Sequence, residues 1–336
     1  MANITTFEIG YCTHLGCMAL RGSPMRSCKF PSRAYLLEVG ERRWLWDTGY
    51  ASYFQQYTAS GIFRLYSQIT PVYFSPQQAL LEQLRSRGVS VGDIEAVIIS
   101  HFHADHIAGL RDFSSLNMIC SGEGWQQTRE LRGFAALKRA FIPGLIPEEF
   151  ESALQFVESF PLQSLPAELA PFQQGYALPG SDGQILIVPL PGHAAGHLGA
   201  FVQTDAGWTL LASDAAWSPL NYQQLRGPSR LANLIMDNPR SYYQTLEALN
   251  QLHHGGAAEI LLCHEGIYDP ADDAMALSAS TQAAFHRTGR TGGLSGASVK
   301  TLCPSVLAHS PYFRPYCLLP VSEWPEMDKA IHDDAF

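Results

Sequence analysis

Short, almost continuous apolar runs recur along the chain and predict β-strands. Six of them stand out because they are rich in β-branched and aromatic residues: 34–39, 43–47, 96–100, 184–190, 208–213 and 259–263. An apolar run without regularly alternating polar positions is typical of a strand that is buried on both faces. We therefore expect sheets that are covered on both sides.

Two longer segments between these runs carry the signals that start and stop a helix. In SPQQALLEQLRSRG, Ser75 is a candidate N-cap, Pro76 takes the first helical position and Gly88 follows the end. The segment NPRSYYQTLEALNQLHHGG begins in the same way at Asn238, and Gly255 is expected to stop it. Strands that alternate with helices predict an α/β fold.

Two regions depart from this alternation. Residues 51–74 are rich in aromatic side chains but follow no clean period, and the chain from about 289 is punctuated by Gly, Ser and Pro. Neither resembles an independent domain, and the chain contains no internal repeat. We expect one domain over residues 1–336, with an aromatic insertion at 51–74 and an irregular C-terminal extension from about 289.

Composition narrows the class of protein further. Hydrophobic residues make up 46% of the chain and charged residues 16%, which predicts an extensive core and argues against disorder. The net charge of −9 argues against nucleic acid or an anionic membrane as the main partner. No apolar run approaches the roughly 18 residues of a membrane span, and no signal peptide is evident, so we expect a cytoplasmic protein.

The seven cysteines are an odd number without a repeating spacing. In a chain of this size that pattern favours reduced thiols in the cytoplasm. A bridge between Cys12 and Cys17, or between Cys17 and Cys28, is the alternative. Cys263 directly precedes His264, and alternation along its strand predicts that its side chain turns away as a small buried hydrophobe.

The stretch ISHFHADHIAGL, at 99–110, carries the densest group of potential metal ligands. His101 and His103 leave an extended segment on the same side, because strand side chains alternate. Asp105 and His106 follow a turn and can aim at a second point nearby. Imidazole and carboxylate bind first-row metals, so this single loop can serve two adjacent metal positions.

Three further candidate ligands each follow an apolar strand. His193 lies in IVPLPGHAAGH, Asp214 in LLASDAAW and His264 in ILLCHEG. Taken alone, each would more often be a hydrogen-bonded or surface residue, and Asp214 a turn cap. Because open α/β sheets build their sites at the C-terminal ends of the strands, we expect all three to meet the histidine-rich loop.

The stretches SHFHADHIAG, PGHAAGH, SDAAW and CHEG together resemble the metallo-β-lactamase fold superfamily, in its metallohydrolase branch. WLWDTG resembles the strand and turn that precede the first motif in that family. The resemblance covers about residues 5–270. It implies an α/β fold: a four-layer αβ/βα sandwich of two mixed β-sheets flanked by helices, with a dinuclear metal site at one edge.

The resemblance also implies a role for each motif residue. It implies seven ligands: His101, His103 and His193 for the first ion, Asp105, His106 and His264 for the second, and Asp214 bridging both. Asp47 would orient a ligand histidine from behind, and His197 would be a hydrogen-bonding partner rather than a ligand. The expected cofactors are two divalent ions, zinc first, with iron, manganese or cobalt as alternatives.

The charge of such a centre favours hydrolysis. Two carboxylates, two divalent cations and a bridging hydroxide leave a core of about +1, which suits a nucleophilic hydroxide and a developing oxyanion. Asp105 is then placed to pass a proton to the leaving oxygen.

Within the superfamily the chain most resembles the N-acyl homoserine lactone lactonases. That group has a catalytic tyrosine three residues after the bridging aspartate, where this chain has Trp217, whose indole can donate a hydrogen bond but cannot exchange a proton. The expected substrate is an N-acyl homoserine lactone or a related acyl ester. The aromatic side chains of the insertion would cover the acyl group, pack the loop, or form a homodimer contact: Tyr53, Phe54, Tyr57, Phe63 and Tyr66.

Other functions stay open at this point. A thioester hydrolase of the hydroxyacylglutathione hydrolase type uses the same ligands, although the 22 Lys and Arg residues are few for its anionic substrate. A persulfide dioxygenase would use one iron and fewer ligands, a nucleic-acid-processing member would carry basic flanks, and a non-catalytic biosynthetic or binding member would have lost a ligand. The triplet at 47–49 also matches aspartic proteases, which need two facing carboxylates.

Overall fold

Two mixed β-sheets form the framework of the part of the chain that the computed structural model describes, residues 1–265. The first sheet has the order β4-β1-β2-β3-β5-β6-β7 and the second the order β13-β12-β11-β10-β9-β8. Strands β1 to β3 pair antiparallel, whereas β3, β5, β6 and β7 run parallel. In the second sheet only the pairing of β12 with β13 is parallel among the described strands.

The strands of the first sheet are β1 (Asn3–Leu15), β2 (Ser27–Val39), β3 (Arg42–Trp46), β4 (Val72–Tyr73), β5 (Ala96–Ile98), β6 (Asn117–Cys120) and β7 (Leu154–Phe156). Those of the second are β8 (Leu162–Ser164), β9 (Gln174–Ala177), β10 (Ile185–Pro189), β11 (Leu198–Thr204), β12 (Gly207–Ser213) and β13 (Ala258–Leu262). The described α-helices are α1 (Gly16–Ala19), α2 (Ser52–Thr58), α3 (Arg64–Ile69), α4 (Leu80–Ser86), α5 (Ala104–Ile107), α6 (Gly122–Thr128), α7 (Gly133–Lys138), α8 (Pro219–Gln223) and α9 (Pro239–Gly255).

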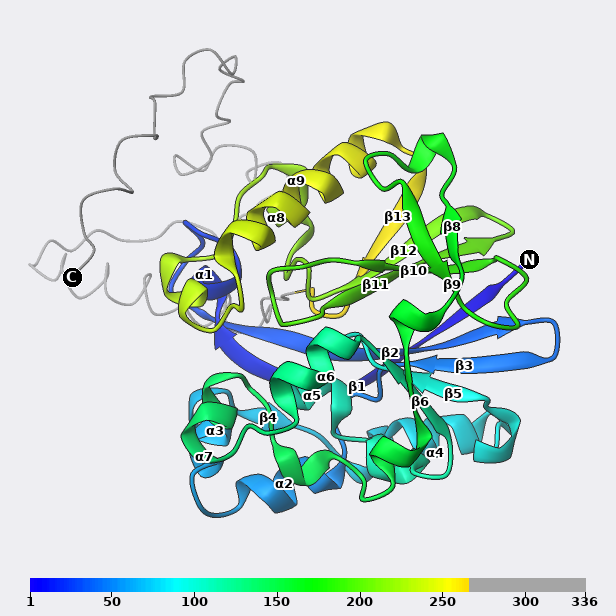
Figure 1. Cartoon of the computed structure of the whole chain (residues 1–336). Coiled ribbons are helices and arrows are strands. Elements are labelled where there is room, and N and C mark those ends of the chain that lie inside the picture. Colours follow the sequence, from blue (N-terminus) through cyan, green and yellow to red (C-terminus); the bar gives the residue numbers. More distant parts are fainter. Residues whose placement is uncertain (266–336) are drawn as a thin grey trace, which may run out of the picture. The chain divides into compact units, whose positions relative to one another are not determined.

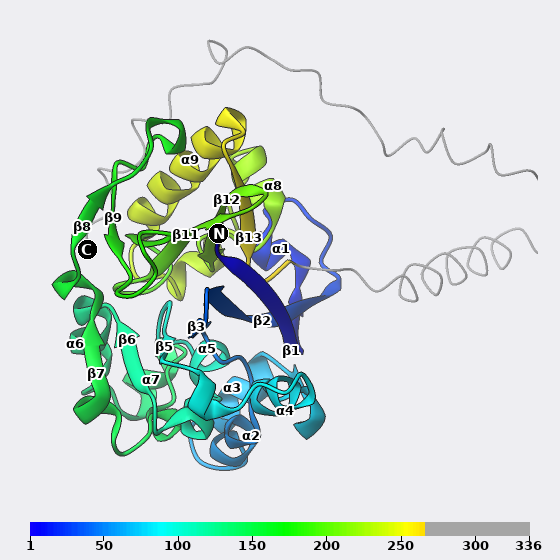
Figure 2. The same cartoon turned by 90° about the vertical axis from the view of Figure 1, so that its right-hand side faces the viewer.

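Three apolar clusters show that these elements stack in four layers. One cluster joins the two sheets and includes Leu37, Trp46 and Leu211. A second packs α2, α4 and α5 on the outer face of the first sheet, and a third packs α9 on the outer face of the second. Figure 1 shows the same order, with α2 and α4 below the first sheet and α9 above the second, and Figure 2 shows it from the side. The predicted sandwich of two sheets between helices is confirmed.

All six predicted apolar runs form strands, and the helix signals hold with small shifts. Ser75 and Gln78 form a capping box, but it closes a 3-10 turn before the α-helix begins at Leu80. The Asn238 side chain accepts a hydrogen bond from the Ser241 N–H at the start of α9. Gly255 is the last residue of that helix, and Gly256 caps it, one residue later than expected. Gly256 stops the helix because it takes the left-handed conformation with φ +66°.

The insertion at 51–74 is more regular than its sequence suggests, since it forms α2, α3 and β4. The sequence analysis also missed β1, the 13-residue strand that pairs with β2 along most of its length. The described cysteines are free, so neither of the two alternative bridges forms. Within residues 1–265, no helix combines the length and the apolar character that crossing a membrane requires. The extension from about 289 lies outside the described residues.

Candidate metal centre

The seven predicted ligands come from the segments that follow four strands, β5, β10, β12 and β13, and two of them, Asp105 and His106, lie in the short helix α5. Three of these segments leave the second sheet and one leaves the first, so the ligands gather at one edge of the sandwich. Glycine shapes the loop after β10. Gly192 has φ +123°, and a Cβ atom there would collide with the backbone of Tyr242 in α9. This close approach brings the loop against α9 and fixes the position of His193.

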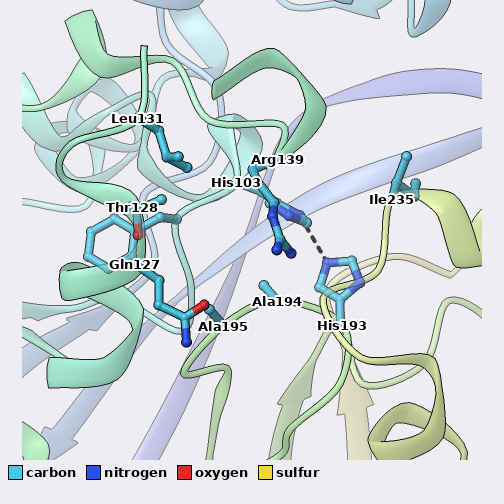
Figure 3. Close-up of a pocket in the computed structure, with 10 residues that line it drawn as sticks. His103, Gln127, Thr128, Leu131, Arg139, His193, Ala194, Ala195 and Ile235 are labelled. Atoms are coloured by element: carbon cyan, nitrogen blue, oxygen red, sulfur yellow. Dashed lines mark hydrogen bonds between the residues drawn. The ribbon is translucent and has the colours of Figure 1, made fainter. Parts of the chain in front are cut away.

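The side chains of the first group converge on one point. The ligand atoms of His101, His103, His193 and Asp214 all lie within 4.8 Å of one another. His103 Nδ1 is 2.9 Å from His193 Nε2, the contact drawn as a dashed line in Figure 3. His193 Nε2 is also 3.3 Å from Asp214 Oδ2.

A second group converges on the other side of Asp214. His264 Nε2 lies 3.3 Å from Asp214 Oδ2 and 3.0 Å from Asp105 Oδ2. His106 Nε2 lies 3.3 Å from Asp214 Oδ1. The Asp214 carboxylate is therefore shared by both groups, with one oxygen facing His106 and the other facing His193 and His264.

The unsatisfied atoms of these groups indicate what fills the space between them. Four buried atoms of the two groups have no hydrogen-bond partner among the described residues: His101 Nε2, His106 Nε2, His193 Nδ1 and Asp214 Oδ1. A buried polar atom without a partner is unfavourable. His101 Nε2, His106 Nε2 and Asp214 Oδ1 point into the groups, so they favour a bound species that the protein itself does not supply. Imidazole nitrogens around a shared carboxylate fit divalent cations of the zinc type.

Hydrogen bonds behind the ligands fix which nitrogen of each ring faces inward. Asp47 Oδ2 accepts from His106 Nδ1 at 2.8 Å and from Ser100 Oγ at 2.7 Å, and Asp47 Oδ1 accepts from the Ser100 N–H at 2.8 Å. Ser100 Oγ in turn lies 3.0 Å from His101 Nδ1. His264 Nδ1 donates to the Pro31 carbonyl at 2.6 Å. These contacts leave Nε2 of all three histidines directed at the centre.

His197 supports Asp214 from outside the two groups. Its Nδ1 donates to the Leu190 carbonyl at 2.9 Å, and its Nε2 accepts from the backbone N–H of Asp214 at 3.2 Å. Burial lowers the pKa of His197 to about 3, so the ring stays neutral and both bonds persist at neutral pH. This geometry matches a positioning role.

The charges of the two groups differ. Burial lowers the pKa values of His101 and His103 well below the usual range, so both rings are neutral and ready to bind a cation. Burial also opposes protonation of His106 and His264, but nearby Cys263 and Asp214 outweigh it and raise both pKa values. The pKa of Asp105 falls to about 2, because His106 and His264 outweigh its burial, and Asp105 is therefore a carboxylate at neutral pH.

Comparison with known proteins shows the family to which the chain belongs. The Metallo-beta-lactamase superfamily model matches residues 29–264 of the chain. The chain belongs to the metallo-beta-lactamase superfamily. The match includes Asp47 and all seven ligands that the motifs predict.

Relatives and solved structures agree with this membership. N-acyl homoserine lactonase AiiB of Agrobacterium fabrum is 27% identical over 251 residues, which cover 71% of this chain and 81% of that protein. The probable metallo-hydrolase YqjP of Bacillus subtilis is 27% identical over 186 residues, 52% of this chain and 56% of that protein. A solved N-acyl homoserine lactone hydrolase with its product N-hexanoyl-L-homoserine at the catalytic metal centre has a TM-score of 0.60 at 17% identity, over 78% of this chain and 92% of that one. These structural likenesses show the superfamily fold.

Trp217, which takes the position of the catalytic tyrosine of the lactonases, contacts two of the candidate ligands. Its indole Nε1 donates to Asp214 Oδ2 at 3.2 Å, and its ring meets the His193 ring edge-on at a centroid distance of 5.4 Å. The one hydrogen-bond donor of the indole is thus directed at Asp214. Trp217 holds that carboxylate in place.

A small cavity opens beside the first group (Figure 3). It measures about 110 Å³, and its lining includes His103, His193, Gln127, Arg139 and Ile235. Arg139 Nη1 is paired with Asp237 Oδ1 at 2.7 Å. The sequence analysis missed Arg139, because a basic residue just after α7 belongs to no motif and only the fold brings it beside the histidines.

The predicted aromatic cover does not line this cavity. Phe54 is buried in the core at 1% exposure, and the Tyr53 hydroxyl donates to Asp112 Oδ1 at 3.0 Å. Tyr57, Phe63 and Tyr66 pack against the same core cluster. Packing of the insertion is thus observed, whereas a cover over an acyl group and a homodimer contact stay predictions.

Cys263 is buried as expected, but its direction differs from the expectation. Its Sγ lies in a group with the ligand atoms of His106, Asp214 and His264, all within 4.8 Å of one another, instead of turning away. Alternation along the strand does not extend to Cys263, because β13 ends at Leu262. Burial raises the pKa of the Cys263 thiol.

Proposed function

We propose that the chain is a metal-dependent hydrolase that opens a lactone or related acyl ester at a dinuclear centre, with an N-acyl homoserine lactone as the first candidate substrate. The observation that carries the proposal is the shared Asp214 carboxylate between two groups of buried, inward-facing histidines. Relatives named as N-acyl homoserine lactonases support the choice of substrate. We further propose that both ions are zinc, as the nitrogen and oxygen donors favour.

Each candidate ligand has a defined role in the proposed reaction. His101, His103 and His193 would hold one ion, Asp105, His106 and His264 the other, and Asp214 both. When bound, the pair supplies a hydroxide nucleophile and a Lewis acid for the substrate carbonyl.

Asp105 is the group suited to move the proton. Its carboxylate is ionised, since its pKa is about 2, and it sits at the edge of the centre with Oδ2 3.0 Å from His264 Nε2. From there it can take the proton of the attacking hydroxide and deliver it to the leaving alkoxide oxygen. Asp47, His197 and Trp217 hold ligands in place, and the cavity beside Arg139 can accept a small polar part of the substrate.

A substrate panel tests the proposal. Purified protein with measured metal content is offered acyl homoserine lactones, acyl thioesters and phosphodiesters, and hydrolysis is followed by proton release or thiol release. The proposal expects lactones to be opened with the highest kcat/KM. Faster turnover of thioesters would replace it by the hydroxyacylglutathione hydrolase alternative, and metal-loaded protein inactive on the whole panel would contradict it.

A further inference from the structure

We propose that Cys263 binds the second metal ion through its sulfur. The motifs of this chain assign only nitrogen and oxygen donors to that ion: Asp105, His106, His264 and Asp214. In the structure, however, Cys263 Sγ belongs to a four-donor group with His106, Asp214 and His264 in which all ligand atoms lie within 4.8 Å of one another. All four residues are buried, with exposures between 0% and 6%.

The unsatisfied atoms of the same group point independently to a cation there. His106 Nε2 and Asp214 Oδ1 approach to 3.3 Å but have no hydrogen-bond partner among the described residues. Two imidazole nitrogens, one carboxylate oxygen and one sulfur make a four-donor set of the kind that zinc binds tetrahedrally. A thiolate also shifts the preference of the position toward zinc and away from manganese, which favours oxygen donors.

The surroundings of the sulfur suit a bound thiolate. The backbone N–H of Arg33, on β2, donates to Cys263 Sγ at 3.3 Å, and Sγ lies 3.5 Å from the Arg33 carbonyl oxygen. An N–H group directed at sulfur stabilises its anionic form and orients it as a ligand. Metal binding would replace only the weak contact between the thiol proton and the Arg33 carbonyl.

The binding step is balanced without any further reactant. A divalent ion forms a bond with Sγ, the S–H bond breaks, and the proton leaves to the buffer. Asp105 is not a member of this four-donor group, although its Oδ2 is 3.0 Å from His264 Nε2 and 3.8 Å from His106 Nε2. In this inference Cys263 takes the place that the proposed function gives to Asp105 among the ligands of the second ion, which leaves the Asp105 carboxylate to carry the proton. The inference rests on the metal centre of the proposed function but not on its substrate.

Cobalt substitution provides the test. The protein is stripped with a chelator and reloaded with cobalt(II), and its near-ultraviolet absorption is recorded beside its cobalt content. We expect a sulfur-to-cobalt charge-transfer band in the unaltered protein, loss of that band in Cys263→Ser, and its retention in Cys120→Ser. Cys120 is the matched control, because it is equally buried but its Sγ is directed at the Ser121 carbonyl. Protein that holds two cobalt ions without the band, or a band that survives in Cys263→Ser, would overturn the proposal.

A second measurement needs no variant, in case Cys263→Ser does not fold. X-ray absorption at the zinc edge of the zinc-loaded protein should contain a sulfur neighbour at about 2.3 Å beside nitrogen and oxygen neighbours at about 2.0–2.1 Å. A shell of nitrogen and oxygen alone contradicts the assignment. Failure to bind metal at all would overturn both this inference and the proposed function, whereas a zinc–sulfur bond in protein that does not open lactones would overturn only the function.

Discussion

Replacing Asp47 by Asn tests the hydrogen-bond network behind the centre with a change of one atom type. Asp47 has φ +58°, a conformation that Asn adopts readily, so the backbone should stay in place. The carboxylate accepts three hydrogen bonds, from the Ser100 N–H, Ser100 Oγ and His106 Nδ1. An amide has only one oxygen, so it cannot accept at both positions.

Either orientation of the amide damages the site. If its oxygen keeps the Ser100 N–H, the NH2 group faces His106 Nδ1, and the ring must place its proton on Nε2, the atom directed at the metal. If the amide flips, two donors meet at the Ser100 N–H. A hydrogen bond to a charged partner is worth about 1.5–3 kcal/mol against about 0.5–1.5 for a neutral one. The weaker hydrogen bond and the wrong tautomer of His106 both act on the ligand of the second ion. We therefore expect this ion to bind about 10–100-fold more weakly.

The assay is competition with a chromophoric chelator, which reports the two metal affinities separately. Asp112→Asn is the matched control, since Asp112 accepts from the Tyr53 hydroxyl and contacts none of the ligands. We expect Asp47→Asn to bind the second ion, the one held by His106, more weakly than the unaltered protein does. Asp112→Asn should bind both ions with unchanged affinity. Unchanged affinity for both ions in Asp47→Asn would refute the reasoning that Asp47 sets the tautomer of His106.

Three further predictions follow from the same geometry. Asp105→Asn, compared with the unaltered protein at equal metal content, should lower kcat on a lactone by about 100-fold or more, and an unchanged kcat would remove Asp105 as the proton carrier. Arg139→Met should raise KM by up to about tenfold with little change in kcat, because a partly exposed guanidinium beside the cavity is lost; a pure kcat effect would argue against a binding role. In metal-free protein, His197 has a folded pKa of about 3 against about 6.5 unfolded, so it contributes stability above pH 6.5 that is lost as the pH falls toward 3, up to about 5 kcal/mol in total. Urea unfolding of metal-free protein at pH 6.5 and pH 4 should show this loss, with a smaller loss in His197→Gln, and equal stability at both pH values would contradict it.

The candidate ligands were predictable because each is tied to a local signal. Every one of them follows an apolar run, and the ends of neighbouring strands meet at an edge of the fold. The sequence therefore predicts that His101, His193 and His264 lie close together, even without knowledge of the strand order. The layers were predictable for a similar reason, since continuous apolar runs indicate strands that are covered on both faces.

What the sequence did not reveal depends on contacts between distant segments. The strand β1 has a burial pattern with both exposed and buried positions, so it lacks the continuous apolar run that marked the others. The place of Cys263 beside the ligand atoms depends on the chain direction after β13 ends, and the hydrogen bond from Trp217 to Asp214 depends on the turn that follows β12. Arg139 reaches the cavity only because the end of α7 packs beside the loop of His193. Side-chain spacing alone contains none of this information.

Metal stoichiometry measured together with activity is the most direct test of the central claim, that seven side chains from four segments hold two divalent ions. Elemental analysis of the purified protein should find two ions per chain, falling to one in His264→Ala, and chelator treatment should abolish lactone hydrolysis until metal is restored. Active protein with fewer than two ions per chain, or full activity after complete removal of metal, would contradict the account.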